Sequence, residues 1–282
     1  MLHFTKMHGI GNDYIYINGF EESLPDDLSA LAVKMSPRHT SVGGDGVIYI
    51  LPSKIADVRM RMFNPDGSEA EMCGNGIRCV AAYSYDRGLC QRTQMTIETG
   101  GGIKNATLTL DSLGRTDAVR IDMGVPKLKG ADIPSVFEGS PVLMQPLTAL
   151  GKTWPVTLVN MSNPHAVIFV KDTSTAPVQT VGPVLEVDPA FPHRCNIEFA
   201  EVVDRAHLNM RVWERGAGET YACGTGASAS VVAAILNGLT DRHVTVKLLG
   251  GELKISWDEQ TGHVYMTGPI AYVYDGTYLG ER

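Results

Sequence analysis

The chain has 282 residues, of which 44% are hydrophobic and 20% charged, a composition typical of a globular protein with well-buried cores. Its formal net charge of −7 argues against nucleic acid or an anionic membrane as a partner. The longest apolar run, about 231–236, is far shorter than the roughly 20 residues of a membrane span, and the N-terminus lacks the apolar core of a signal peptide.

The first half of the chain predicts strands that alternate with two helices. Strands are expected at 2–7 and 14–18, joined by a glycine-containing turn. A helix is expected near 26–35, where Asp26 or Asp27 can cap the first turn. A second helix is expected after Cys73, and further strands at 47–50, 58–63, 95–98, 103–110 and 119–122.

The second half predicts the same order of elements. Strands at 154–159 and 166–170 flank a turn at 162–164, and a helix near 177–185 follows. Another helix is expected after Cys223, and a last strand at 271–278 is expected to return to the first half. The remaining strands are expected at 197–203, 208–213, 244–248, 253–257 and 264–267.

An internal repeat underlies this common order. Residues 60–76 and 210–226 share Met, Arg, Glu, Cys and two Gly positions at a constant offset of 150, and Phe63 aligns with Trp213. The helix at 224–236 carries no charge, which is typical of a helix buried on every face.

We therefore predict an α+β fold of two pseudo-symmetric lobes, each a curved, mostly antiparallel sheet wrapped around a central helix. The N-terminal lobe is expected at 1–123, with a strand at about 270–282 returning to it, and the C-terminal lobe at 124–269.

Each repeat has a cysteine directly before a Gly-x-Gly sequence that opens a helix. The N-terminus of a helix lowers the pKa of a nearby thiol and attracts anions. Two such cysteines on opposite faces of one carbon, one thiolate and one thiol, could remove a proton from one face and return it to the other. Cys73 and Cys223 are therefore the candidate acid/base pair. The backbone N–H groups expected to hold a substrate carboxylate belong to Gly74, Asn75, Gly224 and Thr225.

The other cysteines are interpreted as packing residues. Cys79, Cys90 and Cys195 lie in apolar segments, and an odd total of five favours a reducing, cytoplasmic setting. No histidine or cysteine pair has the spacing of a metal site, and the glycine clusters at 43–46 and 100–102 lack nucleotide-binding patterns. We expect neither a metal nor a cofactor.

The motifs together closely resemble the diaminopimelate epimerase family, over both lobes and in the order of that family. The resemblance implies the two-lobed diaminopimelate-epimerase-like fold, usually a homodimer. It also implies interconversion of LL- and meso-diaminopimelate without pyridoxal phosphate or metal, in lysine and peptidoglycan-precursor biosynthesis. The segments that carry the resemblance are 9–13, 63–68, 72–78, 163–165, 213–216 and 222–226.

The resemblance also implies a role for each site residue. Cys73 and Cys223 exchange the roles of acid and base with the direction of reaction. His165 and Glu214 tune the thiol pKa values, and Arg215 pairs with the distal carboxylate. The implied substrate-binding residues are Asn12, Asn64, Gly74, Asn75, Asn163, Asn196, Glu214, Arg215, Gly224 and Thr225.

One position departs from the family pattern, and two other functions stay open. Many members have Asp-Gln where this chain has Asp45-Gly46, so a backbone group, a neighbour or water must replace the glutamine side chain. The first alternative function is a related racemase acting on proline, hydroxyproline or histidine, although such relatives usually have His at the position of Asn75. The second is a non-enzymatic thiol/disulfide switch.

Overall fold

The structure, a computed structural model, describes residues 1–280, so residues 281 and 282 of the expected C-terminal strand segment lie outside the described residues. The chain divides into two compact units. The first comprises Met1–Ile121 and the C-terminal segment that begins at Thr267, and the second comprises Asp122–Met266.

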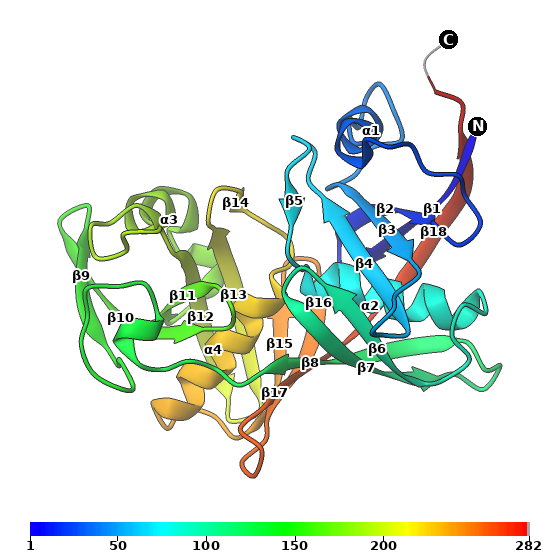
Figure 1. The fold of residues 1–282 in the computed structure, drawn as a ribbon. Coiled ribbons are helices and arrows are strands. Elements are labelled where there is room, and N and C mark those ends of the chain that lie inside the picture. The colour runs from blue at the N-terminus through cyan, green and yellow to red at the C-terminus, as the bar shows by residue number, and fades with distance from the viewer. Residues whose placement is uncertain (281–282) are drawn as a thin grey trace. The chain divides into compact units, whose positions relative to one another are not determined.

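The first unit is a mostly antiparallel sheet around the helix α2 (Gly74–Asp86) (Figure 1). Neighbouring strands pair in the order β18–β1–β2–β3–β4–β6–β7–β8, and only the β2–β3 and β4–β6 pairs are parallel. A second helix, α1 (Leu28–Met35), begins where the Asp27 side chain accepts a 2.8 Å hydrogen bond from the amide of Ala30. The strands are β1 (Leu2–Gly9), β2 (Asn12–Asn18), β3 (Val47–Leu51), β4 (Val58–Phe63), β5 (Glu69–Ala70), β6 (Gln94–Thr99), β7 (Gly102–Leu110), β8 (Thr116–Gly124) and β18 (Ala271–Tyr278).

The second unit repeats this plan around α4 (Gly224–Leu236) (Figure 1). Its strands pair in the order β9–β10–β11–β12–β13–β15–β16, and only β11–β12 and β13–β15 are parallel. The helix α3 (Val178–Glu186) packs against β12 and β13. The strands are β9 (Gln145–Ala149), β10 (Lys152–Asn160), β11 (Pro164–Val170), β12 (Asn196–Asp204), β13 (His207–Glu214), β14 (Gly218–Glu219), β15 (His243–Leu248), β16 (Gly251–Trp257) and β17 (Val264–Pro269), with short 3₁₀ turns at Gly130–Asp132 and Thr173–Thr175.

Strand register makes the repeat visible residue by residue. Val47 pairs with Phe63 between β3 and β4, and Ile197 pairs with Trp213 between β12 and β13, so both partners are displaced by 150 positions. The sequence offset therefore corresponds to a structural equivalence, and the predicted α+β fold is confirmed.

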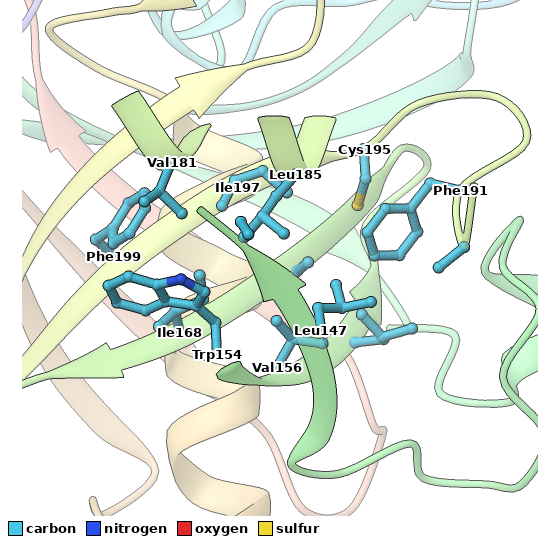
Figure 2. Packing of buried hydrophobic residues seen from close by; sticks show 14 of the residues in the cluster. Leu147, Trp154, Val156, Ile168, Val181, Leu185, Phe191, Cys195, Ile197 and Phe199 are labelled. Atoms are coloured by element: carbon cyan, nitrogen blue, oxygen red, sulfur yellow. The ribbon is translucent and has the colours of Figure 1, made fainter. Parts of the chain in front are cut away.

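Alternation along the strands separates the two faces of the second sheet. Trp154, Ile168, Ile197 and Phe199 point into an apolar cluster beneath α3, which Figure 2 shows from close by. In that cluster the rings of Trp154 and Phe199 meet edge to face with centroids 6.3 Å apart. Since successive side chains of a strand point to opposite faces, Glu198 lies on the other face of β12, toward α4.

Within residues 1–280, the sequence predicted every α-helix and every strand longer than five residues, but it missed three strands. β5 and β14 have only two residues each, and β9 reads Gln-Pro-Leu-Thr-Ala, which lacks a strong alternation. None of the helices among the described residues is long and apolar enough to cross a membrane.

Candidate active site

Both central helices begin at a cysteine whose sulfur caps the first turn. The Cys73 Sγ accepts a hydrogen bond from the amide of Gly76 at 3.4 Å, and the Cys223 Sγ accepts one from Gly226, also at 3.4 Å. Both cysteines have extended backbone angles, as N-cap residues do, and neither forms a disulfide within residues 1–280. Each sulfur is thus held where the helix dipole and unpaired N–H groups favour negative charge.

In the first unit, the Cys73 thiol contacts a short amide network. The thiol donates to Oδ1 of Asn12 at 3.2 Å, and the Asn75 amide donates to the same oxygen at 3.4 Å. Asn12 in turn donates to Oδ2 of Asp45 at 2.7 Å. Burial and the neighbouring Cys73 thiol raise the pKa of Tyr14 well above its usual value. The phenol therefore stays protonated beside the sulfur.

A buried arginine supports the start of α2. The guanidinium of Arg78 donates to Oδ1 of Asn75 at 3.0 Å and to the carbonyl of Gly74 at 3.2 Å. Its Nε donates to the carbonyl of Pro269 at 3.4 Å, and the side chain is fully buried. Burial lowers the pKa of Arg78 from its usual value. The arginine thereby fixes the amide orientation of Asn75.

In the second unit, the surroundings of Cys223 are acidic. Burial, followed by the charges of Glu214 and Glu198, raises the pKa of the Cys223 thiol well above its usual value. The Thr225 hydroxyl, 3.5 Å from Sγ, acts in the opposite direction. Burial also raises the pKa of Glu214, which accepts a hydrogen bond from the Thr220 hydroxyl. These surroundings favour the neutral thiol at Cys223.

A fully buried histidine lies behind this thiol. His165 Nδ1 is 2.6 Å from Oε1 of Glu198, and its Nε2 is 2.9 Å from Oδ1 of Asn163. The Asn163 amide nitrogen donates to the Thr225 hydroxyl at 3.3 Å. A continuous chain of polar groups thus runs from Glu198 to the cysteine.

Three further sequence-predicted residues, Asn64, Asn196 and Arg215, make hydrogen bonds of their own. Asn196 donates to the carbonyl of Pro164 at 2.8 Å and accepts from the amide of Arg215 at 2.9 Å, while the Arg215 side chain is exposed. Asn64 donates to the Ser68 hydroxyl at 3.0 Å within its own turn. The structure therefore connects Asn12 and Asn75 with Cys73, and Asn163, His165, Glu214 and Thr225 with Cys223. Asn196 lies beside the second of these networks, as the partner of His165 across β11 and β12.

Gly46 occupies a position that excludes any side chain. Its φ is +149°, and a Cβ would approach the carbonyl oxygen of Phe63 to 2.2 Å. The preceding residue, Asp45, holds the amide of Asn12. In this chain, the loop therefore contributes to the site through Asp45.

Sequence reasoning missed four residues that contact the site residues: Tyr14, Asp45, Arg78 and Glu198. A signal existed for Glu198, because a carboxylate interrupts the apolar run Ile197-Glu198-Phe199-Ala200. Tyr14 could have been found from the repeat, since it lies 151 positions before His165.

In each unit, the cysteine and its surroundings suit acid/base chemistry beside an anion-binding backbone. Two thiols at helix N-termini can hold or release protons, and adjacent N–H groups can bind a carboxylate. Within residues 1–280, no cluster of three or more His, Cys, Asp or Glu side chains could hold a metal ion.

Comparison with known proteins identifies the family. The sequence profile described as diaminopimelate epimerase matches residues 4–129 and 157–273. The chain is 52% identical over 277 residues to the diaminopimelate epimerase of Moorella thermoacetica, covering 98% of this chain and 99% of that protein. It is 47% identical over 275 residues to that of Methanococcus maripaludis, covering 97% and 98%.

Solved structures share the fold at much lower sequence identity. A phenazine biosynthesis protein of the PhzF family from Bacillus anthracis has a TM-score of 0.72 at 19% identity, with 99% of each chain covered. A probable proline racemase from Agrobacterium radiobacter has a TM-score of 0.72 at 15% identity, covering 100% of this chain and 94% of the other. These likenesses concern the fold, whereas the profile and the sequence relatives show that the chain belongs to the diaminopimelate epimerase family.

Proposed function

We propose that this protein is a cofactor-independent isomerase that interconverts LL- and meso-diaminopimelate with two cysteines as acid and base. The observation that carries the proposal is the pair of cysteine-capped helices, Cys73 with α2 and Cys223 with α4. The chain that holds them is 52% identical to the diaminopimelate epimerase of Moorella thermoacetica. The reaction belongs to lysine and peptidoglycan-precursor biosynthesis.

In the proposed mechanism, one thiolate removes the α-proton and the other thiol protonates the opposite face. Cys73 and Cys223 exchange these roles when the direction of reaction reverses. Negative charge that develops on the substrate carboxylate is stabilised by the N–H groups at the two helix N-termini. Those groups belong to Gly74, Asn75, Gly224 and Thr225.

The other candidate residues are proposed to bind the substrate or to adjust the pKa values of the two thiols. Arg215, whose guanidinium is exposed and donates one hydrogen bond to the carbonyl of His193 at 3.2 Å, is proposed to bind the distal carboxylate. His165 and Glu214 set the proton affinity of the thiols. Asn12, Asn64, Asn163, Asn196 and Glu214 are proposed to complete the substrate contacts.

We also propose a cytoplasmic location and a homodimeric assembly. The net charge of −7 and the five cysteines, which form no disulfide in the described structure, are compatible with a reducing cytoplasm, and the family resemblance favours a homodimer. Light scattering on the purified protein tests the dimer: a single species at twice the chain mass supports it, and a monomer contradicts it.

The isomerisation assay tests the activity itself. Purified protein is incubated with LL-diaminopimelate, L-proline and L-histidine, and stereoisomers are separated by chiral chromatography. We expect turnover of diaminopimelate alone, lost in the Cys73→Ala and Cys223→Ala variants. Turnover of proline or histidine alone would instead support the racemase alternative. Ligand binding without any α-proton exchange would support the thiol/disulfide switch.

A further inference from the structure

We propose that Glu198 is a positioning residue that keeps a proton on Nε2 of His165 and so orients the polar chain ending at Cys223. This inference rests on the proposed function, which it deepens by assigning a role to a residue that does not touch the substrate. Glu198, His165, Asn163, Thr225 and Cys223 all belong to the second unit.

Glu198 is a carboxylate in the middle of a buried strand. Its side chain and that of His165 are both 0% exposed. Burying a carboxylate costs several kcal/mol unless a partner or hydrogen bonds compensate, and within residues 1–280 no hydrogen-bond donor reaches its Oε2. A leucine or isoleucine would pack there at lower cost. The contact to His165 is therefore the feature that distinguishes this residue from an apolar one.

The two hydrogen bonds of His165 determine where its protons lie. Oδ1 of Asn163, the carbonyl-type oxygen 2.9 Å from Nε2, can only accept, so Nε2 must carry a proton. A second proton lies between Nδ1 and Glu198 Oε1, which are 2.6 Å apart. Whether that proton stays on nitrogen or on oxygen, Nε2 remains a donor. A ring protonated on Nδ1 alone would place two acceptors in contact at Asn163.

The orientation of Asn163 carries this constraint to the thiol. With Oδ1 turned toward His165, its amide nitrogen donates to the Thr225 hydroxyl at 3.3 Å. That hydroxyl has accepted one hydrogen bond and can direct its own proton to Cys223 Sγ, 3.5 Å away. A hydroxyl that donates to sulfur stabilises the thiolate. The chain thus assists Cys223 whenever it acts as base.

Glycine at the start of α4 lets the carboxylate approach the helix. A Cβ on Gly226 would lie 2.8 Å from Oε1 of Glu198 and 3.2 Å from the Cys223 sulfur. Glu198 therefore lies directly beneath the first turn of the helix that Cys223 caps.

The first unit lacks this arrangement, although its backbone is equivalent. Ile48 stands 150 positions before Glu198 and Tyr14 stands 151 before His165, while the asparagine is retained as Asn12. Asn12 is held by Asp45 instead of a histidine. The Glu198–His165 pair thus has no counterpart at the equivalent positions of the first unit, and within its own unit it is linked to Cys223, so its loss should affect Cys223.

Two variants and one control separate positioning from simple structural support. Glu198→Gln donates an amide proton to Nδ1 and so preserves the proton on Nε2. Glu198→Ile introduces the residue of the first unit and leaves Nδ1 without a partner. Glu201→Gln, on the same strand, changes a carboxylate whose contacts go to Thr173 and Asn209 and serves as the control.

We expect Glu198→Ile to lower kcat about 100-fold with little change in KM, and Glu198→Gln to recover at least about tenfold of that loss. The pH profile of kcat should change in both variants and not in the control. Among the described residues, the titratable groups that also act on the pair or on the Cys223 thiol are Cys195, through Glu198, and Glu214. Wild-type kcat and pH profile in Glu198→Ile, or equal losses in all three variants, would overturn the proposal.

A second measurement does not depend on substrate. Both variants remove the Glu198 charge, which raises the pKa of Cys223, so they are compared with each other. The rate of Cys223 alkylation by iodoacetamide, followed by peptide mass mapping across pH, should be lower in Glu198→Ile than in Glu198→Gln, while that of Cys73 stays within twofold between them. Nitrogen-15 NMR of His165 should show a protonated Nε2 in the wild type and in Glu198→Gln. If the wild type fails to turn over diaminopimelate, the proposed function fails, and these two readouts still decide the role of Glu198. An unprotonated Nε2, or equal alkylation of Cys223 in the two variants, would refute that role. Should Glu198→Ile not fold, an unchanged pH profile in Glu198→Gln would refute it.

Discussion

Cys73 and Cys223 cap α2 and α4 in the same way, each with its sulfur 3.4 Å from the amide nitrogen three residues later. Side-chain oxygens are the usual N-cap acceptors, and a thiol is a weaker one. Stronger hydrogen bonding to the ionised sulfur therefore favours the thiolate. The geometry suits a residue that must gain and lose a proton in every cycle.

Single-cysteine variants should separate proton removal from inversion. With one thiol replaced by alanine, the other can still remove and return a proton on its own face. We expect Cys73→Ala and Cys223→Ala each to lose epimerisation by at least about 10³-fold. In heavy water each variant should exchange the α-proton of one epimer only, and the two variants should select opposite epimers. NMR detects the exchange, and exchange of both epimers by either variant would contradict the assignment.

Replacement of Glu214 should lower kcat/KM and raise the Tm, and the rise in Tm should depend on pH. Because burial raises the pKa of Glu214, its contribution to stability is present below the unfolded value of 4.5 and lost as pH rises through the folded value. Because glutamine cannot ionise, Glu214→Gln avoids the stability that the wild type loses when Glu214 ionises. Its Tm should therefore exceed the wild-type Tm by about 1–3 °C at pH 7.5 and by little at pH 4. kcat/KM should fall about 10²-fold. A Tm gain that is largest at pH 4 would contradict a raised pKa of Glu214.

A matched pair of glycine variants tests the loop beside Asn12. Gly46→Ala places a Cβ 2.2 Å from the carbonyl oxygen of Phe63, whereas Gly88→Ala, with φ at +76°, meets nothing within 4 Å. We expect Gly46→Ala to lower the free energy of unfolding by about 3 kcal/mol or more and Gly88→Ala by about 1 kcal/mol. Urea denaturation measures both, and equal losses would contradict the crowding at Gly46.

Arg78 should matter through the orientation of Asn75. Arg78→Lys keeps the charge but cannot reach Asn75, Gly74 and Pro269 together. We expect the free energy of unfolding to fall by about 2–4 kcal/mol and kcat/KM to fall as well. Arg87→Lys, at an exposed ion pair with Asp275, is the control and should change stability by less than about 1 kcal/mol. Wild-type kcat/KM in Arg78→Lys would refute the link to Asn75.

Much of the fold could be predicted because local signals and the repeat agree. Apolar periodicity located the helices, the Asp27 cap marked the start of α1, and the offset of 150 matches the paired registers of β3–β4 and β12–β13. The strand β9 was not predicted because Gln145–Ala149 has little apolar alternation.

The site could be predicted only where a motif is local. Cys73 and Cys223 could be predicted because each directly precedes a Gly-x-Gly sequence. The contact of Glu198 with His165 depends on the parallel register of β11 and β12, and that of Asn12 with Asp45 joins the first residue of β2 to the loop that precedes β3. Nothing in the local sequence specifies such pairings, since parallel strands are joined by long connections.

The most direct test of the two-thiol mechanism follows solvent deuterium during turnover of LL-diaminopimelate by the wild-type enzyme. Initial meso product should carry deuterium at the inverted carbon, while the LL-diaminopimelate that remains at early times stays largely protonated. Mass spectrometry of the separated isomers measures both pools. Product that keeps the original hydrogen, or substrate that gains deuterium faster than product forms, would contradict separate acids and bases on the two faces.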